Sequence, residues 1–252
     1  MSHTRIYQNQ DFSCTQIITL DTEASHKLKK VLRLNNGDTI TLFNGKENAE
    51  YRACITSMAK TTTVEIKQKI ITASHNTANM HLIQGICRQD KMDFVIQKAV
   101  ELGIASFTPL INENKHHSFN KKAISKKMQH WQKVIISACE QSGCNVLPKL
   151  NPPITPKDFL NNIKLLATDT ALLFSLHDEK QLSLAKLKLS KQTENIFILI
   201  GSEGGFTKEE VTGFIQNGFT NYSLGTQILR AETAPIVVLS ILKYLWDLKL
   251  SS

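Results

Sequence analysis

Short apolar runs alternate with amphipathic segments from residue 80 onward, and this alternation constrains the fold more than any other feature of the 252-residue chain. The segment 90–103 has helical spacing, with Asp90 as the expected N-cap and Gly103 at its end. Strands that alternate with helices predict an α/β domain with a mostly parallel sheet. The expected strands lie within 80–87, 105–111, 165–177, 195–201 and 219–225, and the expected helices cover 90–103, 121–143 and 236–246.

The first 72 residues have a different pattern. Stretches such as AEYRACITSM (49–58) alternate apolar and polar residues, as half-buried strands do. One helical segment, 25–34, should place Leu28, Val31 and Leu32 on one face. A small β-barrel carrying one basic helix fits residues 1–72, the polar stretch 71–80 is the expected linker, and 73–252 is the expected α/β domain.

Composition excludes several classes of protein. The chain is 41% hydrophobic but has no apolar run long enough to span a bilayer, and its N-terminus lacks the apolar core of a signal peptide. The five cysteines are scattered and form no CxxC pair, which argues against a disulfide framework and against a metal cluster. We therefore expect a cytoplasmic protein with no membrane partner and no metal.

The net charge of +8 is unevenly distributed. Residues 1–72 carry +3, residues 73–150 carry +5 and the remainder is neutral. Residues 115–133 hold six lysines and no acid, which is often only a solvated helix face. With this overall charge, however, a polyanionic partner is favoured. The candidate phosphate contacts are Lys27, Lys29, Lys30, Arg33, Lys121, Lys122, Lys126 and Lys127.

The apolar run 195–200 stops at the glycine-rich loop GSEGG (201–205). Thr207 and Glu210 have capping-box spacing, so a helix should begin directly after it. Ligands of open α/β sheets bind beyond the carboxyl ends of the strands, and glycines allow close approach to the main chain. The loop lacks the Walker, dinucleotide-binding and serine-nucleophile patterns. A tight turn that binds nothing remains the alternative.

A second loop, 224–234, follows the next strand and also opens a helix. Pro235 suits that helix's first turn, with Thr233 or Ala234 as its cap. Arg230 and Glu232 stand just before the apolar run, where a surface ion pair of small energetic effect is the alternative to a functional role. Two such loops predict a slot lined by main-chain groups, which suits a flat ligand.

Four segments, CRQDKMDFVIQKAVELGIASFTPL, HWQKVIISACEQSG, ILIGSEGGFTKEE and LGTQILRAETA, resemble the bacterial RsmE-type methyltransferases in the same order over nearly the whole chain. The resemblance implies a SPOUT-class α/β domain with a trefoil knot, an N-terminal PUA-like domain and a homodimer. It also implies S-adenosylmethionine as cofactor and N3 of a uridine in 16S ribosomal RNA as target, within an assembled or partly assembled 30S subunit. The knot follows from the resemblance alone, because knots are rare exceptions to chain-threading rules.

The resemblance also implies site residues. The chemistry of this reaction favours Arg230 to stabilise charge on the uracil carbonyls or to orient a phosphate, and Glu232 or Glu203 to accept the N3 proton. The alternative for Glu203 is that it braces its own loop by accepting backbone N–H bonds. Arg88 and Gln141 are weaker candidates for the uridine pocket, and a third wall is expected from the loop after 171–177. The implied cofactor-binding residues are Ile200, Gly201, Ser202, Glu203, Gly204, Gly205, Ser223, Leu224, Gly225, Ile228, Leu229, Arg230, Thr233 and Ala234.

Two positions depart from the family pattern. Ser202 stands where the family usually has proline, and Cys144 where it tends to have arginine. Three alternative functions stay open at this point: an RNA-binding protein that lost the cofactor, a knotted methyltransferase for transfer RNA or another ribosomal position, and an unrelated nucleotide-binding enzyme. The amino-acid sequence does not identify the target nucleotide.

Overall fold

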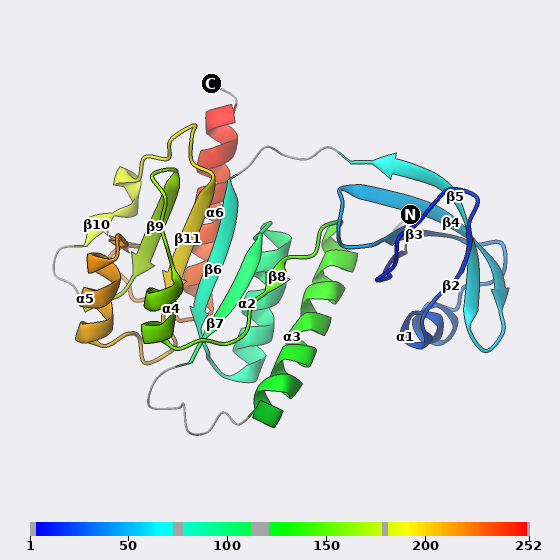
Figure 1. The fold of residues 1–252 in the computed structure, drawn as a ribbon, viewed down its shortest axis with the longest axis horizontal. Helices are drawn as coiled ribbons and strands as arrows, with labels where there is room; N and C mark the ends of the chain where they lie inside the picture. The colour runs from blue at the N-terminus through cyan, green and yellow to red at the C-terminus, as the bar shows by residue number, and fades with distance from the viewer. Residues whose placement is uncertain (1–3, 73–77, 112–120, 178–180, 251–252) are drawn as a thin grey trace. The chain divides into compact units, whose positions relative to one another are not determined.

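The structure is a computed structural model that describes residues 4–72, 78–111, 121–177 and 181–250 (Figure 1). The chain divides into two compact units. The N-terminal unit comprises residues 1–75 and 136–147, and the C-terminal unit comprises 76–135 and 148–252. None of the helices within the described ranges has the length and apolar character needed to cross a membrane.

A five-stranded sheet, with the strand order β1-β3-β4-β5-β2, forms the N-terminal unit. Only β1 and β3 run parallel, and the other neighbours are antiparallel. The alternation read from the sequence is confirmed in β4 and in the first half of β5, whereas β3 is buried over its last four residues. Apolar residues of these three strands form one core with Leu28. The strands are β1 (Arg5–Tyr7), β2 (Ile17–Thr19), β3 (Thr39–Phe43), β4 (Ala49–Met58) and β5 (Thr62–Ile71).

The basic helix of this unit differs from expectation. It consists of α1 (Thr22–His26) followed by a π-helical turn, η1 (Lys27–Val31). The N–H of Leu32 donates to the carbonyl of Lys27, five residues back, so each turn holds more residues than in an α-helix. Leu28 is fully buried as predicted, but Val31 is 66% exposed and Leu32 is also exposed. The prediction that all three share a buried face is wrong, because the wider turn changes the spacing.

The C-terminal end of α3 (Lys121–Ser142) and the residues after it belong to the N-terminal unit. The Glu140 carboxylate accepts from the Tyr7 N–H at 3.1 Å and pairs with the Lys27 ammonium. The buried Asn145 accepts from the Arg5 guanidinium at 2.7 Å and donates to Thr72 at 3.0 Å. This grouping differs from the expected division after residue 72, which kept the whole helix in the second domain.

The C-terminal unit is built on a seven-stranded sheet in which every neighbouring pair is parallel, so the predicted parallel α/β fold is confirmed. The strand order is β10-β12-β9-β11-β6-β7-β8. The strands are β6 (Asn79–Gly85), β7 (Ser106–Leu110), β8 (Lys149–Leu150), β9 (Asp169–Phe174), β10 (Leu182–Ser183), β11 (Asn195–Ile200) and β12 (Thr220–Ser223). The helices are α2 (Gln89–Glu101), α4 (Pro156–Asn162), the short η3 (Leu184–Lys186), α5 (Lys208–Gln216) and α6 (Thr233–Leu250), besides most of α3.

Register in this sheet brings three strand ends together. Ile200 at the end of β11 pairs with Gln84 of β6 on one side and with Phe174 of β9 on the other. Strand β12 follows on the far side of β9, pairing Asn221 with Leu173. The segments that leave β9, β11 and β12 therefore start at one edge of the sheet (Figure 1).

Some helix ends lie where the capping residues in the sequence predicted them, and others do not. The capping box of Thr207 and Glu210 is present at the start of α5, as predicted. Gly103 follows α2 with φ of +87°, as expected for a helix end. Two expectations are wrong: the N-cap of α2 is Arg88 rather than Asp90, and α6 begins at Thr233 itself, so Glu232 directly precedes the helix.

Candidate functional site

A cavity of about 480 Å³, here called the strand-end pocket, lies at the carboxyl ends of β9, β11 and β12. Its walls are the segments that follow these three strands, together with Lys91 from α2 and Ala234 from α6. The described residues that line it are Lys91, Phe174, Ser175, Leu176, His177, Gln181, Ile200, Gly201, Ser202, Glu203, Gly204, Gly205, Tyr222, Ser223, Leu224, Gly225, Gln227, Ile228, Leu229, Arg230, Ala231 and Ala234.

The loop after β11 is a tight turn with little room for side chains. The Gly205 N–H donates to the Ser202 carbonyl at 2.9 Å, and Gly205 has φ of +66°, in the left-handed region. A Cβ at Gly201 would lie 2.9 Å from the Gly205 Cα, so glycine is required there by backbone contact. A Cβ at Gly204 would meet no atom of the described residues within 4 Å, so this glycine leaves its main chain open to a ligand.

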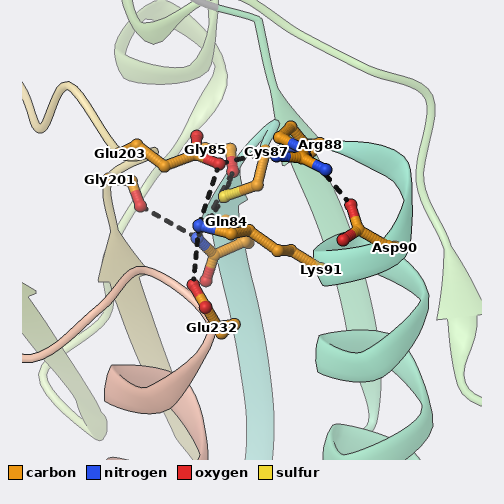
Figure 2. A network of polar contacts seen from close by, with 9 residues as sticks. All are labelled: Gln84, Gly85, Cys87, Arg88, Asp90, Lys91, Gly201, Glu203 and Glu232. Carbon is orange, nitrogen blue, oxygen red and sulfur yellow. Dashed lines mark hydrogen bonds and ion pairs between the residues drawn. The ribbon is translucent and has the colours of Figure 1, made fainter.

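The end of β6 contacts the main chain of this loop. Gln84 is fully buried, and its amide nitrogen donates to the Gly201 carbonyl at 2.9 Å (Figure 2). A Cβ at Gly85 would lie 2.3 Å from the Ser202 nitrogen, so glycine is required at this second strand end as well. Neither residue stood out in the sequence, because both are ordinary members of an apolar strand pattern.

The walls formed by β9 and β12 are held together by one buried amide. Asn221 accepts from the Ser175 N–H and donates to the Ser175 carbonyl, both at 3.1 Å. This exchange imitates a pair of main-chain hydrogen bonds and continues the ladder past the last strand pair. On the β12 side, the Ser223 hydroxyl accepts from the Gly225 N–H at 3.2 Å and so shapes the start of the second loop.

Two carboxylates and one ammonium meet beside the pocket (Figure 2). The Lys91 Nζ lies 3.4 Å from Glu203 Oε1 and 3.2 Å from Glu232 Oε2. Glu203 also accepts from the Arg88 N–H at 3.4 Å. Glu203 and Lys91 line the strand-end pocket, whereas Glu232 is outside the lining. The geometry therefore brings together the two carboxylates considered as proton acceptors, but exposes only one of them to the cavity.

The three groups keep one another charged. A hydrogen bond from its own backbone N–H lowers the pKa of Glu232 against the effect of burial, and Lys91 and Arg230 add to this. Burial opposes ionisation of Glu203, but backbone N–H donors and Lys91 outweigh it and its pKa is lowered. The contact with the Glu232 carboxylate raises the pKa of Lys91 above its usual value. At neutral pH, both carboxylates are therefore ionised and the amine is protonated.

Arg230 is exposed at the pocket wall, and its carbonyl accepts from the N–H groups of Thr233 and Ala234 at 2.9 and 3.0 Å. These two bonds fix its main chain to the first turn of α6. No residue within the described ranges hydrogen-bonds to the Arg230 guanidinium, so its planar fork is available to a ligand.

The sequence-derived cofactor set coincides closely with the pocket wall. Every member lines the cavity except Thr233, which is exposed at the start of α6. The expected third wall corresponds to the lining residues that flank 178–180, which are themselves outside the described residues. The sequence analysis missed Lys91, Gln181 and the aromatic residues Phe174 and Tyr222. For Lys91, only its place in the first turn of a helix after a strand end could have indicated it.

The candidate RNA contacts fall into two groups. Lys27 is paired with Glu140, Lys29 donates to the Met58 carbonyl at 3.2 Å, and the Lys127 ammonium lies 5.8 Å from the centre of the Trp131 ring. Residues 115–120 of the basic run lie outside the described ranges. The exposed candidates are Lys30, Arg33, Arg88, Lys121, Lys122, Lys126 and Gln141.

The two departures from the family pattern are both partly enclosed. Ser202 is buried in the turn after β11. The Cys144 thiol donates to the Val146 carbonyl at 3.1 Å. A hydrogen bond from the neighbouring Cys139, which outweighs burial, lowers the pKa of Cys144 to about 7. Cys144 therefore does not reproduce the constant positive charge of an arginine.

Two family models match the chain. The model described as an RNA methyltransferase domain matches residues 74–243, and the model described as an RNA methyltransferase PUA domain matches residues 20–67. The ribosomal RNA small subunit methyltransferase E of Buchnera aphidicola (subsp. Acyrthosiphon pisum) is 34% identical over 241 residues, which cover 95% of this chain and 92% of the relative. The protein of that name from Rickettsia conorii is 32% identical and covers 97% of each chain.

Solved structures agree over the same length. A putative methyltransferase from Legionella pneumophila, in complex with the bound cofactor SAM, superposes with a TM-score of 0.89 at 34% identity, covering 97% of this chain and 98% of that one. A ribosomal RNA small subunit methyltransferase E from Neisseria gonorrhoeae, bound to S-adenosyl methionine, superposes with a TM-score of 0.88 at 32% identity and the same coverage.

Proposed function

The chain belongs to the RNA methyltransferase family, and we propose that it transfers a methyl group from S-adenosylmethionine to N3 of one uridine in 16S ribosomal RNA. The observation that carries the proposal is the strand-end pocket, whose walls are the segments after three neighbouring parallel strands. The relatives of nearly equal length that are named above support the choice of substrate and cofactor.

The residues around the pocket fit this cofactor. Its volume of about 480 Å³ lies within the range of roughly 300–1,000 Å³ typical of ligand pockets. The turn 201–205 and the loop 223–230 offer main-chain donors and acceptors to an adenosine group, and Leu224, Ile228 and Leu229 offer apolar surface. Glycine at position 204 leaves space for a ligand against the backbone.

S-adenosylmethionine, when bound, supplies a methyl group activated by a sulfonium cation. The chain's own residues must then align the uracil and manage the proton on N3. The Arg230 guanidinium is placed to stabilise negative charge that develops on the uracil carbonyls. Glu203 is ionised and lines the pocket, whereas Glu232 pairs with Lys91 outside the pocket lining. We therefore assign the role of proton acceptor to Glu203 rather than to Glu232.

RNA binding in this proposal uses exposed cations outside the pocket. The target base must leave its stack before N3 is accessible. Lys30, Arg33, Lys121, Lys122 and Lys126 would contact phosphates, which set affinity and register rather than base identity. A homodimer, a cytoplasmic location, a 30S substrate and an RNA-binding role for residues 1–72 belong to the same proposal.

The experiment that tests the function is nucleoside analysis after incubation with methyl-labelled S-adenosylmethionine. Unmodified 30S subunits, free 16S ribosomal RNA and bulk transfer RNA serve as separate substrates. We expect label in N3-methyluridine from the ribosomal substrates. Label in transfer RNA alone would favour a different RNA target, and tight binding of ATP without binding of S-adenosylmethionine would favour an unrelated nucleotide-binding enzyme.

A further inference from the structure

Lys91 occupies a position where three separate segments converge. It lies in the first turn of α2, and its ammonium contacts one carboxylate from the loop after β11 and one from the residue just before α6 (Figure 2). The two loops that these carboxylates belong to form two walls of the strand-end pocket. Neither the methyl transfer nor the proton transfer described above uses Lys91.

The charges around Lys91 are only partly accessible to water. The side chains of Lys91, Glu232 and Glu203 are 21%, 17% and 37% exposed. Glu232 Oε2 is buried and has no partner with hydrogen-bond geometry among the described residues, although it lies 3.2 Å from Lys91 Nζ. A carboxylate in such a place is unfavourable without a nearby cation. The ammonium thus compensates two carboxylates that would otherwise repel each other.

We propose that Lys91 is a positioning residue that holds the loop after β11 and the start of α6 together by binding one carboxylate from each. The inference rests on the proposed function, because it assumes that both loops hold S-adenosylmethionine. If the ammonium is removed, Glu203 and Glu232 repel, the two walls separate, and cofactor affinity falls.

Other titratable groups near this cluster do not replace Lys91. Burial raises the pKa of the Cys87 thiol to about 12, with Glu203 adding to the effect, so this thiol is neutral. The Arg88 side chain is exposed and lies 3.5 Å from Asp90, while its N–H faces Glu203. The charge of Arg230 lowers the pKa of Glu232 only by a long-range electrostatic effect. Among the described residues, Lys91 is therefore the only side-chain cation within ion-pair distance of the two carboxylates, and without it only backbone N–H groups and the more distant charge of Arg230 act on them.

The role has a pH signature. In the native protein the lowered pKa of each glutamate keeps both carboxylates ionised over the neutral range, so affinity for the cofactor should change little with pH there. Without the ammonium, the pKa of each carboxyl rises, and protonation at lower pH relieves their repulsion. The deficit should therefore be largest when both are ionised and should shrink as the pH falls, whereas a purely space-filling role would give a constant deficit.

The test is the affinity of the full-length protein for S-adenosylmethionine, measured by calorimetry across a pH series with Lys91→Met and Lys91→Arg. Lys98→Met is the matched control, because Lys98 lies on the same helix and pairs with Glu101 at 2.8 Å outside the pocket. For Lys91→Met we expect a loss of about tenfold or more near pH 8 and a loss of less than about threefold near pH 4, below the ordinary pKa of a glutamate. Lys91→Arg and Lys98→Met should stay within about threefold of the native protein throughout.

The double variant Lys91→Met/Glu232→Gln separates charge from packing. It removes the ammonium and one of the two facing charges, so it should bind the cofactor more tightly than Lys91→Met alone and unfold at a higher temperature. A double variant no better than the single one, or a deficit independent of pH, would overturn the role of Lys91. Failure of the native protein to bind S-adenosylmethionine would instead overturn the proposed function together with this inference.

Discussion

Some residues around the strand-end pocket maintain its shape, and others face the space that a ligand would occupy. Gly85 and Gly201 are required by contacts within the protein, whereas a Cβ at Gly204 would meet no atom of the residues that the structure describes. Arg230 lines the pocket, whereas Glu232 lies outside the pocket lining and pairs with Lys91. Substitutions can therefore distinguish residues that shape the site from residues that a ligand touches.

Gly204→Val should leave the fold intact and abolish S-adenosylmethionine binding, because the added methyls would occupy space next to the backbone that only a ligand needs. Gly201→Ala should lose binding and also about 1–3 kcal/mol of stability, because its Cβ collides with the main chain of Gly205. Thermal unfolding and calorimetry distinguish the two effects. Unchanged cofactor affinity in a folded Gly204→Val protein would remove this residue from the cofactor site.

Arg230→Lys should lose most of the methylation rate and little cofactor affinity, since lysine keeps the charge but not the planar fork. The measurement is the single-turnover rate with saturating cofactor, with Arg52→Lys on β4 as a control at an exposed arginine. A rate for Arg230→Lys within a factor of about two, equivalent to roughly 0.4 kcal/mol, would contradict the role assigned to Arg230.

Secondary-structure elements set the spacing of the pocket walls. The sheet pairs β12 with β9 over only two residue pairs, Thr220 with Leu172 and Asn221 with Leu173. The Asn221 side chain extends this short pairing by two hydrogen bonds to Ser175, which itself lines the pocket. Two walls of the site thus depend on one buried amide in a short strand.

Asn221→Leu should destabilise the protein by about 1–3 kcal/mol, because leucine is similar in size but leaves the buried Ser175 N–H without its acceptor. Cofactor affinity should fall in parallel, since β9 and β12 both end at the pocket. Thermal unfolding with and without S-adenosylmethionine measures both quantities. Asn161→Leu, at an exposed position of α4, is the control, and equal stability of the two variants would show that the amide does not brace the strands.

At the scale of the whole molecule, charge and cofactor chemistry lie in different parts of the chain. Residues 1–72 carry +3 and residues 73–150 carry +5, while the neutral remainder contains all of the pocket residues except Lys91. The end of α3 joins the N-terminal unit through Glu140 and Asn145. We expect RNA affinity to depend on both units and cofactor affinity on one.

A fragment that starts at Asn79 should bind S-adenosylmethionine within about threefold of the full chain, since every lining residue is retained. It should methylate ribosomal RNA very poorly and show a flatter salt dependence of RNA binding, by roughly 0.7–0.9 log units in slope for each phosphate that the fragment no longer binds. Affinities of both proteins across a salt series test this. An equal slope would show that residues 1–72 do not bind RNA, and a folded fragment unable to bind the cofactor would show that the division is drawn in the wrong place.

Local features of this protein could be predicted from the amino-acid sequence. Alternation predicted β4 and β5, an apolar run predicted β11, and the spacing of Thr207 and Glu210 predicted the capping box of α5, because these features depend on neighbours within a few residues. The glycine loop and the loop before α6 were identified as a ligand slot, and both line the pocket. The three-dimensional fold was needed to find that Lys91 contacts both loops, that Glu232 lies outside the pocket lining and that residues 136–147 belong to the N-terminal unit. The physical reason is that these contacts join residues far apart in the chain, whose meeting depends on strand order and register, and no short-range pattern records either.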